Sequence, residues 1–252
     1  MKVLMIVTSN DRLGDTGHKT GLWLEELAAP YYVFIDAGAQ VTLASPKGGP
    51  APVDPRSEAD EAQNKATRRF TADTVAMAAL KATVPLADVR PEDHDVLFYP
   101  GGHGPLWDLV DDARSVAVIE AMHRAGKPVA AVCHGPAVLV RATTPDGKPL
   151  VARRNVTGFS NAEEDVVGLS QVVPFLLQDE LTRLGAKYER GPLWEPHVVV
   201  DGLLVTGQNP ASSERTATEV LGVLSRSCGC TPFPGEPVRE PGEPGEPGKQ
   251  GA

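Results

Sequence analysis

The chain has 252 residues, a net charge of −9 and a hydrophobic fraction of 41%. This length fits one large domain or two small ones, and the composition allows a sizeable buried core. The acidic balance, without a basic stripe, argues against nucleic acid as a partner. No run reaches the roughly 20 apolar residues that a membrane helix needs, and the first residues lack a signal-peptide pattern. With three cysteines and no export signal, the cytoplasm is the predicted compartment and a disulfide framework is not expected.

Apolar periodicity predicts strands and helices in alternation. The chain begins with a predicted strand at Lys2–Val7 and a helix at Gly21–Ala37, which ends before Gly38. The further predicted elements are a strand at Gln40–Ala44, a helix at Ala72–Val84, a strand at Asp95–Tyr99, a helix at Asp111–Ala125, a strand before Cys133 and a helix after it, a hairpin signal at Thr143–Ala152, a strand at Val156–Phe159, a helix at Val173–Leu184, a hairpin of His197–Val200 with Leu203–Thr206, and a helix at Ala211–Arg226. The alternation predicts an α/β fold, a doubly wound three-layer sandwich with a mostly parallel, flavodoxin-like sheet.

The composition changes near the C-terminus. Residues 1–230 are predicted to form a single α/β domain, because strands and helices alternate through most of that range. From Thr231 onward the chain consists mainly of proline, glycine and glutamate. Such a segment cannot bury apolar surface, so residues 231–252 are predicted to be a disordered tail.

Cys133 ends a short apolar strand and is followed at once by His134, Gly135 and Pro136. A strand, sharp turn and helix in this order are typical of a nucleophile elbow, which presents its side chain at the end of a sheet. The helix N-terminus is expected to favour the thiolate of Cys133, and His134 is a second ionisable group close to the same point. A buried and inert cysteine at a strand end is the alternative interpretation.

The turn Gly101-Gly102-His103-Gly104 follows the strand predicted at Asp95–Tyr99. Glycine allows backbone N–H groups to approach a ligand closely, so donors from Gly102 and from His134 are candidates for stabilising an oxyanion. Gly101 and His103 are further candidate substrate-binding residues of this turn. A tight turn that requires positive φ would explain the same motif.

Carboxylates occupy two places where they can serve this chemistry. Glu163 and Glu164 follow a predicted strand, and one of them can orient His134 as the third member of a Cys–His–acid arrangement. Acidic residues in a first helical turn, after an N-cap at Asn161, are the alternative interpretation. Glu26 lies on the apolar stripe of the first helix, where a buried carboxyl has a raised pKa and can transfer protons. The spacing of His and Cys residues does not indicate a metal site.

Taken together and in this order, the motifs resemble the ThiJ/PfpI superfamily, which shares its fold with class I glutamine amidotransferases. The likeness spans about residues 2–224 and is greatest to the branch of glutathione-independent glyoxalases (glyoxalase III) and related stress chaperones. The segments that carry it are Lys19–Gly21 with Glu26 and Pro30, Ala44–Gly49 with Asp54 and Ser57, Tyr99–Gly104, Val132–Pro136, Thr157–Glu164, and Thr206–Ser213.

The resemblance implies roles for individual residues. Cys133 matches the family's nucleophile, Glu164 the acid that pairs with His134, and Glu26 the buried glutamate that hydrogen-bonds the sulfur. The N–H groups of Gly102 and His134 match the oxyanion donors. Glu163 stays an alternative to Glu164 because a shift of one residue would exchange them.

The chain departs from the amidotransferase pattern at two places. The usual Gly-x-Cys-x-Gly elbow has Ala131 in place of its first glycine, and the late segment Glu195-Pro196-His197 does not supply a His-x-Glu pair. Both departures argue against glutamine hydrolysis.

The function implied by the resemblance is a cofactor-independent glyoxalase. Such an enzyme converts 2-oxoaldehydes such as methylglyoxal to 2-hydroxy acids (D-lactate) through a cysteine hemithioacetal, with Glu26 or His134 as the base. The expected partners are the small-molecule substrate and a second copy of the chain in a homodimer, without a metal or other cofactor. The alternatives are a stress-response holding chaperone with Cys133 as a redox sensor, a cysteine peptidase or amidase, and a protein deglycase.

Overall fold

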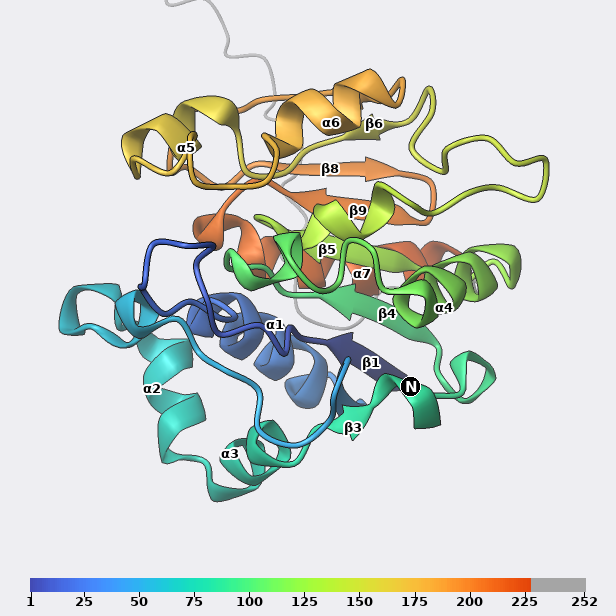
Figure 1. Ribbon diagram of the computed structural model, residues 1–252. Coiled ribbons are helices and arrows are strands. Elements are labelled where there is room, and N and C mark those ends of the chain that lie inside the picture. Colours follow the sequence, from blue (N-terminus) through green and yellow to red (C-terminus); the bar gives the residue numbers. More distant parts are fainter. Residues whose placement is uncertain (228–252) are drawn as a thin grey trace, which may run out of the picture.

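The structure is a computed structural model that describes residues 1–227. The tail predicted at 231–252 lies outside the described residues. A central sheet of seven strands has the order β3-β2-β1-β4-β5-β9-β8 (Figure 1). Its strands are β1 (Lys2–Ile6), β2 (Gln40–Ser45), β3 (Val84–Pro85), β4 (Val96–Tyr99), β5 (Val129–Val132), β8 (Val198–Asp201) and β9 (Leu204–Gly207). Neighbouring strands are parallel except β8, which runs antiparallel to β9.

The sheet is buried on both faces, as the alternation of side chains along β1 shows. Val3 and Met5 belong to the core beneath α1 (Leu24–Asp36) and α7 (Ser213–Ser227). Leu4 and Ile6 point into a second core, which includes apolar residues of α4 (Ala113–Arg124). Helices therefore cover both faces (Figure 1). The predicted α/β sandwich with a mostly parallel sheet is confirmed.

Several predicted boundaries are wrong for local reasons. The helix expected at Ala72–Val84 is the shorter α3 (Thr74–Lys81), and a helix that was not predicted, α2 (Lys65–Ala72), precedes it. Asp73 separates the two helices because its side chain accepts hydrogen bonds from the first backbone N–H groups of α3 and caps that helix. The first helix begins at Leu24 rather than Gly21.

The region after Cys133 also differs from prediction. A short 3₁₀ helix at Gly135–Leu139 stands where an α-helix was expected. The hairpin signal at Thr143–Ala152 produces only an isolated antiparallel bridge between Thr143 and Pro149. The strand predicted at Val156–Phe159 is shorter, and the helix predicted at Val173–Leu184 begins four residues later, at Leu177. The elements here are β6 (Asn155–Val156), α5 (Asn161–Val166), α6 (Leu177–Arg183) and β7 (Lys187–Tyr188), with β6 and β7 forming a separate parallel pair.

The order of the strands brings distant loops to one edge of the sheet. Strand β1 has β2 on one side and β4 on the other, so the chain changes direction across the sheet at β1. In such folds the carboxyl ends of the strands frame the ligand site. The loops after β4 and β5, which contain Gly102 and Cys133, lie at this edge. Within residues 1–227, no helix has the length and apolar character needed to cross a bilayer.

Candidate functional site

Cys133 occupies a strained turn directly after β5. Its φ of +59° is unusual for a residue other than glycine. The backbone is held on both sides: Cys133 N donates to Gly207 O at 2.9 Å, and Cys133 O accepts from Phe159 N at 2.8 Å. Such a conformation costs on the order of 1–3 kcal/mol and persists when surrounding contacts enforce it. The turn has the geometry of a nucleophile elbow.

We expect Cys133→Gly to be more stable than Cys133→Ala by about 1 kcal/mol, because glycine adopts positive φ without the steric cost of a Cβ. Both changes remove the sulfur, so alanine is the matched control for the lost side chain. The free energy of unfolding in urea would measure the difference. A glycine variant no more stable than the alanine variant would show that the turn stores no strain.

His134 links the cysteine to Glu164. Its Nδ1 lies 3.5 Å from Cys133 Sγ, and its Nε2 lies 2.6 Å from Glu164 Oε2. A carboxylate accepts hydrogen bonds, so Nε2 carries the proton and Nδ1 presents its lone pair to the sulfur. His103 Nε2 lies 2.8 Å from the other oxygen, Glu164 Oε1. The side chain of His103 therefore faces the carboxylate and is not an oxyanion donor.

The charges of this cluster follow from its contacts. Burial alone would raise the pKa of Glu164, but electrostatic interaction with His134 and hydrogen bonds from both histidines lower the pKa below its usual range. Burial, and then the neighbouring His134, lower the pKa of His103 to about 4. At neutral pH the cluster thus contains an ionised Glu164 and a neutral His103.

Glu163 is also buried, but it faces away from the cysteine. Its carboxylate accepts hydrogen bonds from Ser160 N and Oγ, Trp194 N, Gln208 Nε2 and Asn209 Nδ2, at 2.7–3.1 Å. The N-cap of α5 is Ser160, one residue before the expected Asn161, and Glu163 completes a capping box with it. The two adjacent glutamates therefore have different surroundings, and Glu164 is the one that contacts His134.

Glu26 is fully buried at the start of α1, whereas Glu25 is half-buried. Glu26 Oε2 accepts a hydrogen bond from Gly101 N at 2.8 Å. Its Oε1 has no hydrogen-bond partner among residues 1–227, and Glu26 lines the same cavity as Cys133. Burial raises the pKa of Glu26 well above its usual value, so the carboxyl is protonated at rest.

The expected low pKa of Cys133 is not found. Burial raises the pKa of the thiol, and the nearby Glu26 raises it further, while a hydrogen bond from the Gly102 N–H opposes the rise. The 3₁₀ helix that follows also lacks the length of the expected α-helix. Cys133 is therefore a thiol at rest and needs a base, for which His134 Nδ1 is in place.

We expect Glu26→Gln to change how stability depends on pH. In the unfolded chain Glu26 ionises above its ordinary pKa of 4.5, whereas in the folded protein it keeps its proton. The wild type therefore loses stability relative to the glutamine variant as pH rises above this value, by up to about 1.4 kcal/mol per pH unit. Urea denaturation of both proteins between about pH 4 and pH 8 would measure it. A constant difference in stability would contradict the buried, protonated state.

The glycines after β4 allow this close packing. A Cβ on Gly101 would lie 2.6 Å from Glu26 Oε2 and 2.7 Å from His134 N, so no other residue fits without displacing them. Gly102 has a φ of +83°, and a Cβ there would lie 2.4 Å from Gly21 O. The positive φ of Gly102 confirms the tight turn, and the close approach of its N–H group to a ligand stays a prediction.

A cavity of about 170 Å³ lies beside Cys133, which is itself only 4% exposed. Apart from a few polar groups, its walls are apolar or aromatic. The lining residues are Trp23, Glu26, Arg56, Gly102, His103, Cys133, His134, Phe159, Val167, Trp194 and Pro210. No pattern in the sequence singles out Arg56, because an arginine in a Pro/Gly-rich loop resembles any surface residue.

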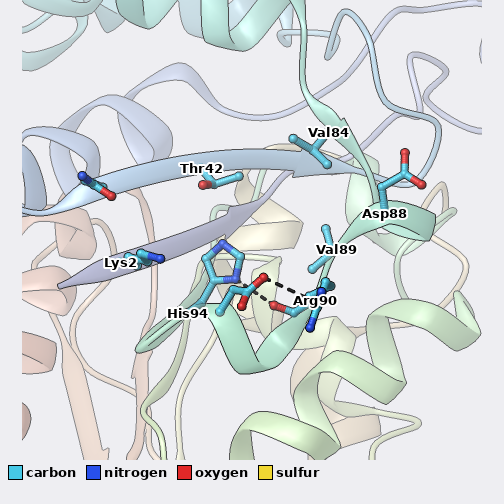
Figure 2. Close-up of a pocket in the computed structure, with 9 residues that line it drawn as sticks. Lys2, Thr42, Val84, Asp88, Val89, Arg90 and His94 are labelled. Carbon is cyan, nitrogen blue, oxygen red and sulfur yellow. Dashed lines mark hydrogen bonds and ion pairs between the residues drawn. The ribbon is translucent and has the colours of Figure 1, made fainter.

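A larger hollow of about 420 Å³ lies elsewhere, over β1 and β2 near Thr42 and Val84 (Figure 2). Arg90 on its wall pairs with Glu92 at 3.1 Å, and His94 Nδ1 lies 3.1 Å from Arg90 O. It contains no cysteine and none of the predicted site residues. The smaller cavity beside Cys133 is therefore the candidate site.

Ligand atoms of His103, His134 and Glu164 lie within 4.8 Å of one another, close enough to hold a metal ion. The hydrogen bonds already described place a proton on each histidine Nε2, directed at the carboxylate. A metal ion at these atoms would have to displace both protons. The observed arrangement fits a hydrogen-bonded acid–base cluster.

Residues 20–222 match the model of the DJ-1/PfpI family. The chain is 31% identical to the glutathione-independent glyoxalase HSP31 of Saccharomyces cerevisiae, over 88% of this chain and 98% of that protein. The solved structure of glyoxalase III from Candida albicans has a TM-score of 0.83 and 30% identity, covering 88% of this chain and 97% of that one. The Rapid Encystment Protein 24 KDa of Francisella tularensis has a TM-score of 0.85 and 37% identity, covering 88% and 98%. The chain therefore belongs to the DJ-1/PfpI family.

Proposed function

We propose that this protein is a glutathione-independent glyoxalase that converts 2-oxoaldehydes such as methylglyoxal to 2-hydroxy acids such as D-lactate. The observation that carries the proposal is the buried group of Cys133, His134, Glu164 and Glu26 around one small cavity. Relatives with the same fold and about 30% identity are named glyoxalases, one of them glutathione-independent. The proposed reaction uses only groups of this chain and water.

The first step joins the cysteine to the substrate. His134 Nδ1 takes the thiol proton, and the positive charge that results is stabilised by the ionised Glu164. The sulfur adds to the aldehyde carbon C1, and the N–H groups of Gly102 and His134 are the proposed donors to the developing oxyanion. Glu26, protonated at rest, gives its proton to this oxygen. The product is a neutral hemithioacetal, and Glu26 is left as a carboxylate.

The second step moves hydrogen from C1 to C2. The Glu26 carboxylate removes the C1 proton, and the electrons of that C–H bond form the C1–C2 double bond of an enediolate. Glu26 returns its proton to C2, while the proton on the C1 oxygen passes to the C2 oxygen by way of His134. A thioester of the 2-hydroxy acid results, and water hydrolyses it to release the acid and the Cys133 thiol. The proton that His134 took from the thiol in the first step then passes through water to the Glu26 carboxylate, which restores both groups. Glu26 is therefore proposed as the base for carbon, and His134 as the base for sulfur.

The cavity favours this reaction over peptide hydrolysis. Its volume of about 170 Å³ accommodates a small aldehyde, and Cys133 lies at its buried end, 4% exposed. A peptidase needs a groove that admits an extended chain on both sides of its nucleophile. A holding chaperone, the alternative from a different class, would not need Cys133, and deglycation would use the same cysteine.

The test is a direct assay of the purified protein with methylglyoxal, without added glutathione, in which D-lactate is measured. We expect D-lactate to accumulate in proportion to enzyme, and added glutathione to leave the rate unchanged. Absence of D-lactate at millimolar methylglyoxal would refute the glyoxalase proposal. Aggregation assays and peptide substrates would then separate the remaining alternatives.

The compartment and the assembly state are proposals drawn from the sequence. The small number of cysteines, three in 252 residues, supports a reducing cytoplasm, and the family resemblance supports a homodimer. Sedimentation analysis would detect the dimer, and a single species at the 26.7 kDa monomer mass would contradict it.

A further inference from the structure

Among residues 1–227, Arg56 is the only lysine or arginine that lines the cavity containing Cys133. It lies in a 3₁₀ helix at Pro55–Glu58. Its side chain is 44% exposed, whereas its partner Asp54 is fully buried. The guanidinium thus keeps contact with solvent, and its charge is compensated by the buried Asp54 carboxylate.

Asp54 holds Arg56 in a fixed position. Arg56 Nε and Nη2 donate to the two carboxylate oxygens at 3.0 and 2.8 Å, and Arg56 N donates to the same group at 2.9 Å. Thr20 Oγ1 donates a further hydrogen bond to Asp54 at 2.9 Å. Paired bonds of this kind fix the plane of the guanidinium. Arg56 Nη1 makes no hydrogen bond within residues 1–227 and remains available to a ligand.

Arg56 also approaches His103, which contacts Glu164. Arg56 Nη2 lies 3.4 Å from His103 Nδ1, so the arginine is a donor to this neutral ring. If Arg56 only positions His103, its effect on the reaction depends on this contact. If Arg56 acts on the substrate directly, its effect depends on Nη1 and a ligand in the cavity. The two roles make different predictions, because only the direct one survives removal of His103.

We propose that Arg56 is a further catalytic residue, which donates a hydrogen bond to the C2 oxygen of the bound 2-oxoaldehyde and stabilises the enediolate. This inference rests on the proposed function. When the C1–H bond breaks, its proton goes to Glu26, its electrons form the C1–C2 double bond, and the former carbonyl pair moves onto the C2 oxygen. That oxygen gains negative charge, and a guanidinium beside it matches the change.

The test uses two alkylating agents that do not require turnover. In iodoacetate and iodoacetamide, the carbon attacked by sulfur is bonded directly to a carbon that carries oxygen, which is the spacing of C1 and C2 in the substrate. The oxygen is anionic in iodoacetate and neutral in iodoacetamide. The ratio of their rates with Cys133 therefore reports a cation at the position of the C2 oxygen.

We expect Arg56→Gln to lower the iodoacetate-to-iodoacetamide rate ratio by about tenfold or more, since it removes a charge-assisted donor. Arg56→Lys keeps a positive charge and should retain part of the ratio. It also provides a second variant at this position in case Arg56→Gln does not fold. His103→Gln should leave the ratio unchanged. An unchanged ratio in Arg56→Gln overturns the proposal. A ratio that falls equally in His103→Gln, with no further fall in the double variant, also overturns it.

Turnover then separates this proposal from the glyoxalase proposal. With methylglyoxal, Arg56→Gln should lower kcat by about 10²–10³-fold, as expected for loss of one oxyanion donor. A fall in the alkylation ratio without any D-lactate from wild type would support the anion site and refute the glyoxalase function. D-lactate formation at wild-type rate by Arg56→Gln would refute the catalytic role of Arg56 alone.

Discussion

Cys133→Ala is expected to abolish D-lactate formation, with a loss in kcat of at least about 10³-fold, because no other group can form the hemithioacetal. Among residues 1–227, Cys133 is the only cysteine, and it lies in the cavity with its base and its proposed proton donor. The change removes one sulfur from a buried site and keeps the Cβ. Activity with methylglyoxal, measured as D-lactate, is the readout.

Cys228→Ala is the matched control, because it removes a cysteine of the chain from outside the described residues. It should retain wild-type activity. Substantial D-lactate formation by Cys133→Ala would refute the assignment of the nucleophile, whatever the activity of the control. Circular dichroism of both variants would verify that they fold.

Glu164→Gln and Glu163→Gln are expected to impair different properties, the first the turnover number and the second the stability of the fold. Glu164→Gln removes the charge that stabilises His134 as it takes the thiol proton, and should lower kcat by about 10²–10⁴-fold. Glu163→Gln places an NH₂ group among hydrogen-bond donors, so it should lower the free energy of unfolding by about 1–3 kcal/mol. Its folded fraction should keep most of the wild-type kcat, because Glu163 contacts neither Cys133 nor His134.

Urea denaturation and steady-state kinetics on both variants measure this contrast. The two substitutions are the same change at adjacent positions, so each serves as the control for the other. The assignment of Glu164 fails if Glu163→Gln folds normally and loses as much kcat as Glu164→Gln. It also fails if Glu164→Gln turns over methylglyoxal at the wild-type rate.

Much of the fold follows from local pattern. The apolar run at Lys2–Val7 coincides closely with β1, because a strand buried on both faces needs nearly uninterrupted apolar sequence, and the more mixed segment Gln40–Ala44 coincides with β2, whose first half is less buried. Predictions failed where a single polar side chain overrides periodicity. The helix expected at Ala72–Val84 begins only at Thr74, because the Asp73 side chain accepts hydrogen bonds from Val75 N and Ala76 N and caps α3.

The sequence by itself determined which residues could carry the chemistry: a cysteine and histidine at a strand end, glycines after the neighbouring strand, and a glutamate on an apolar helix stripe. It left Glu163 and Glu164 unresolved, because adjacent residues in a helix start have equal local patterns. Only the tertiary structure decided between them, since β5 and the start of α5 meet through a packing contact far apart in sequence. Folding also sets the direction in which each pKa shifts. Burial keeps Cys133 and Glu26 protonated, whereas two histidines keep Glu164 ionised, and such environments exist only once the chain has folded.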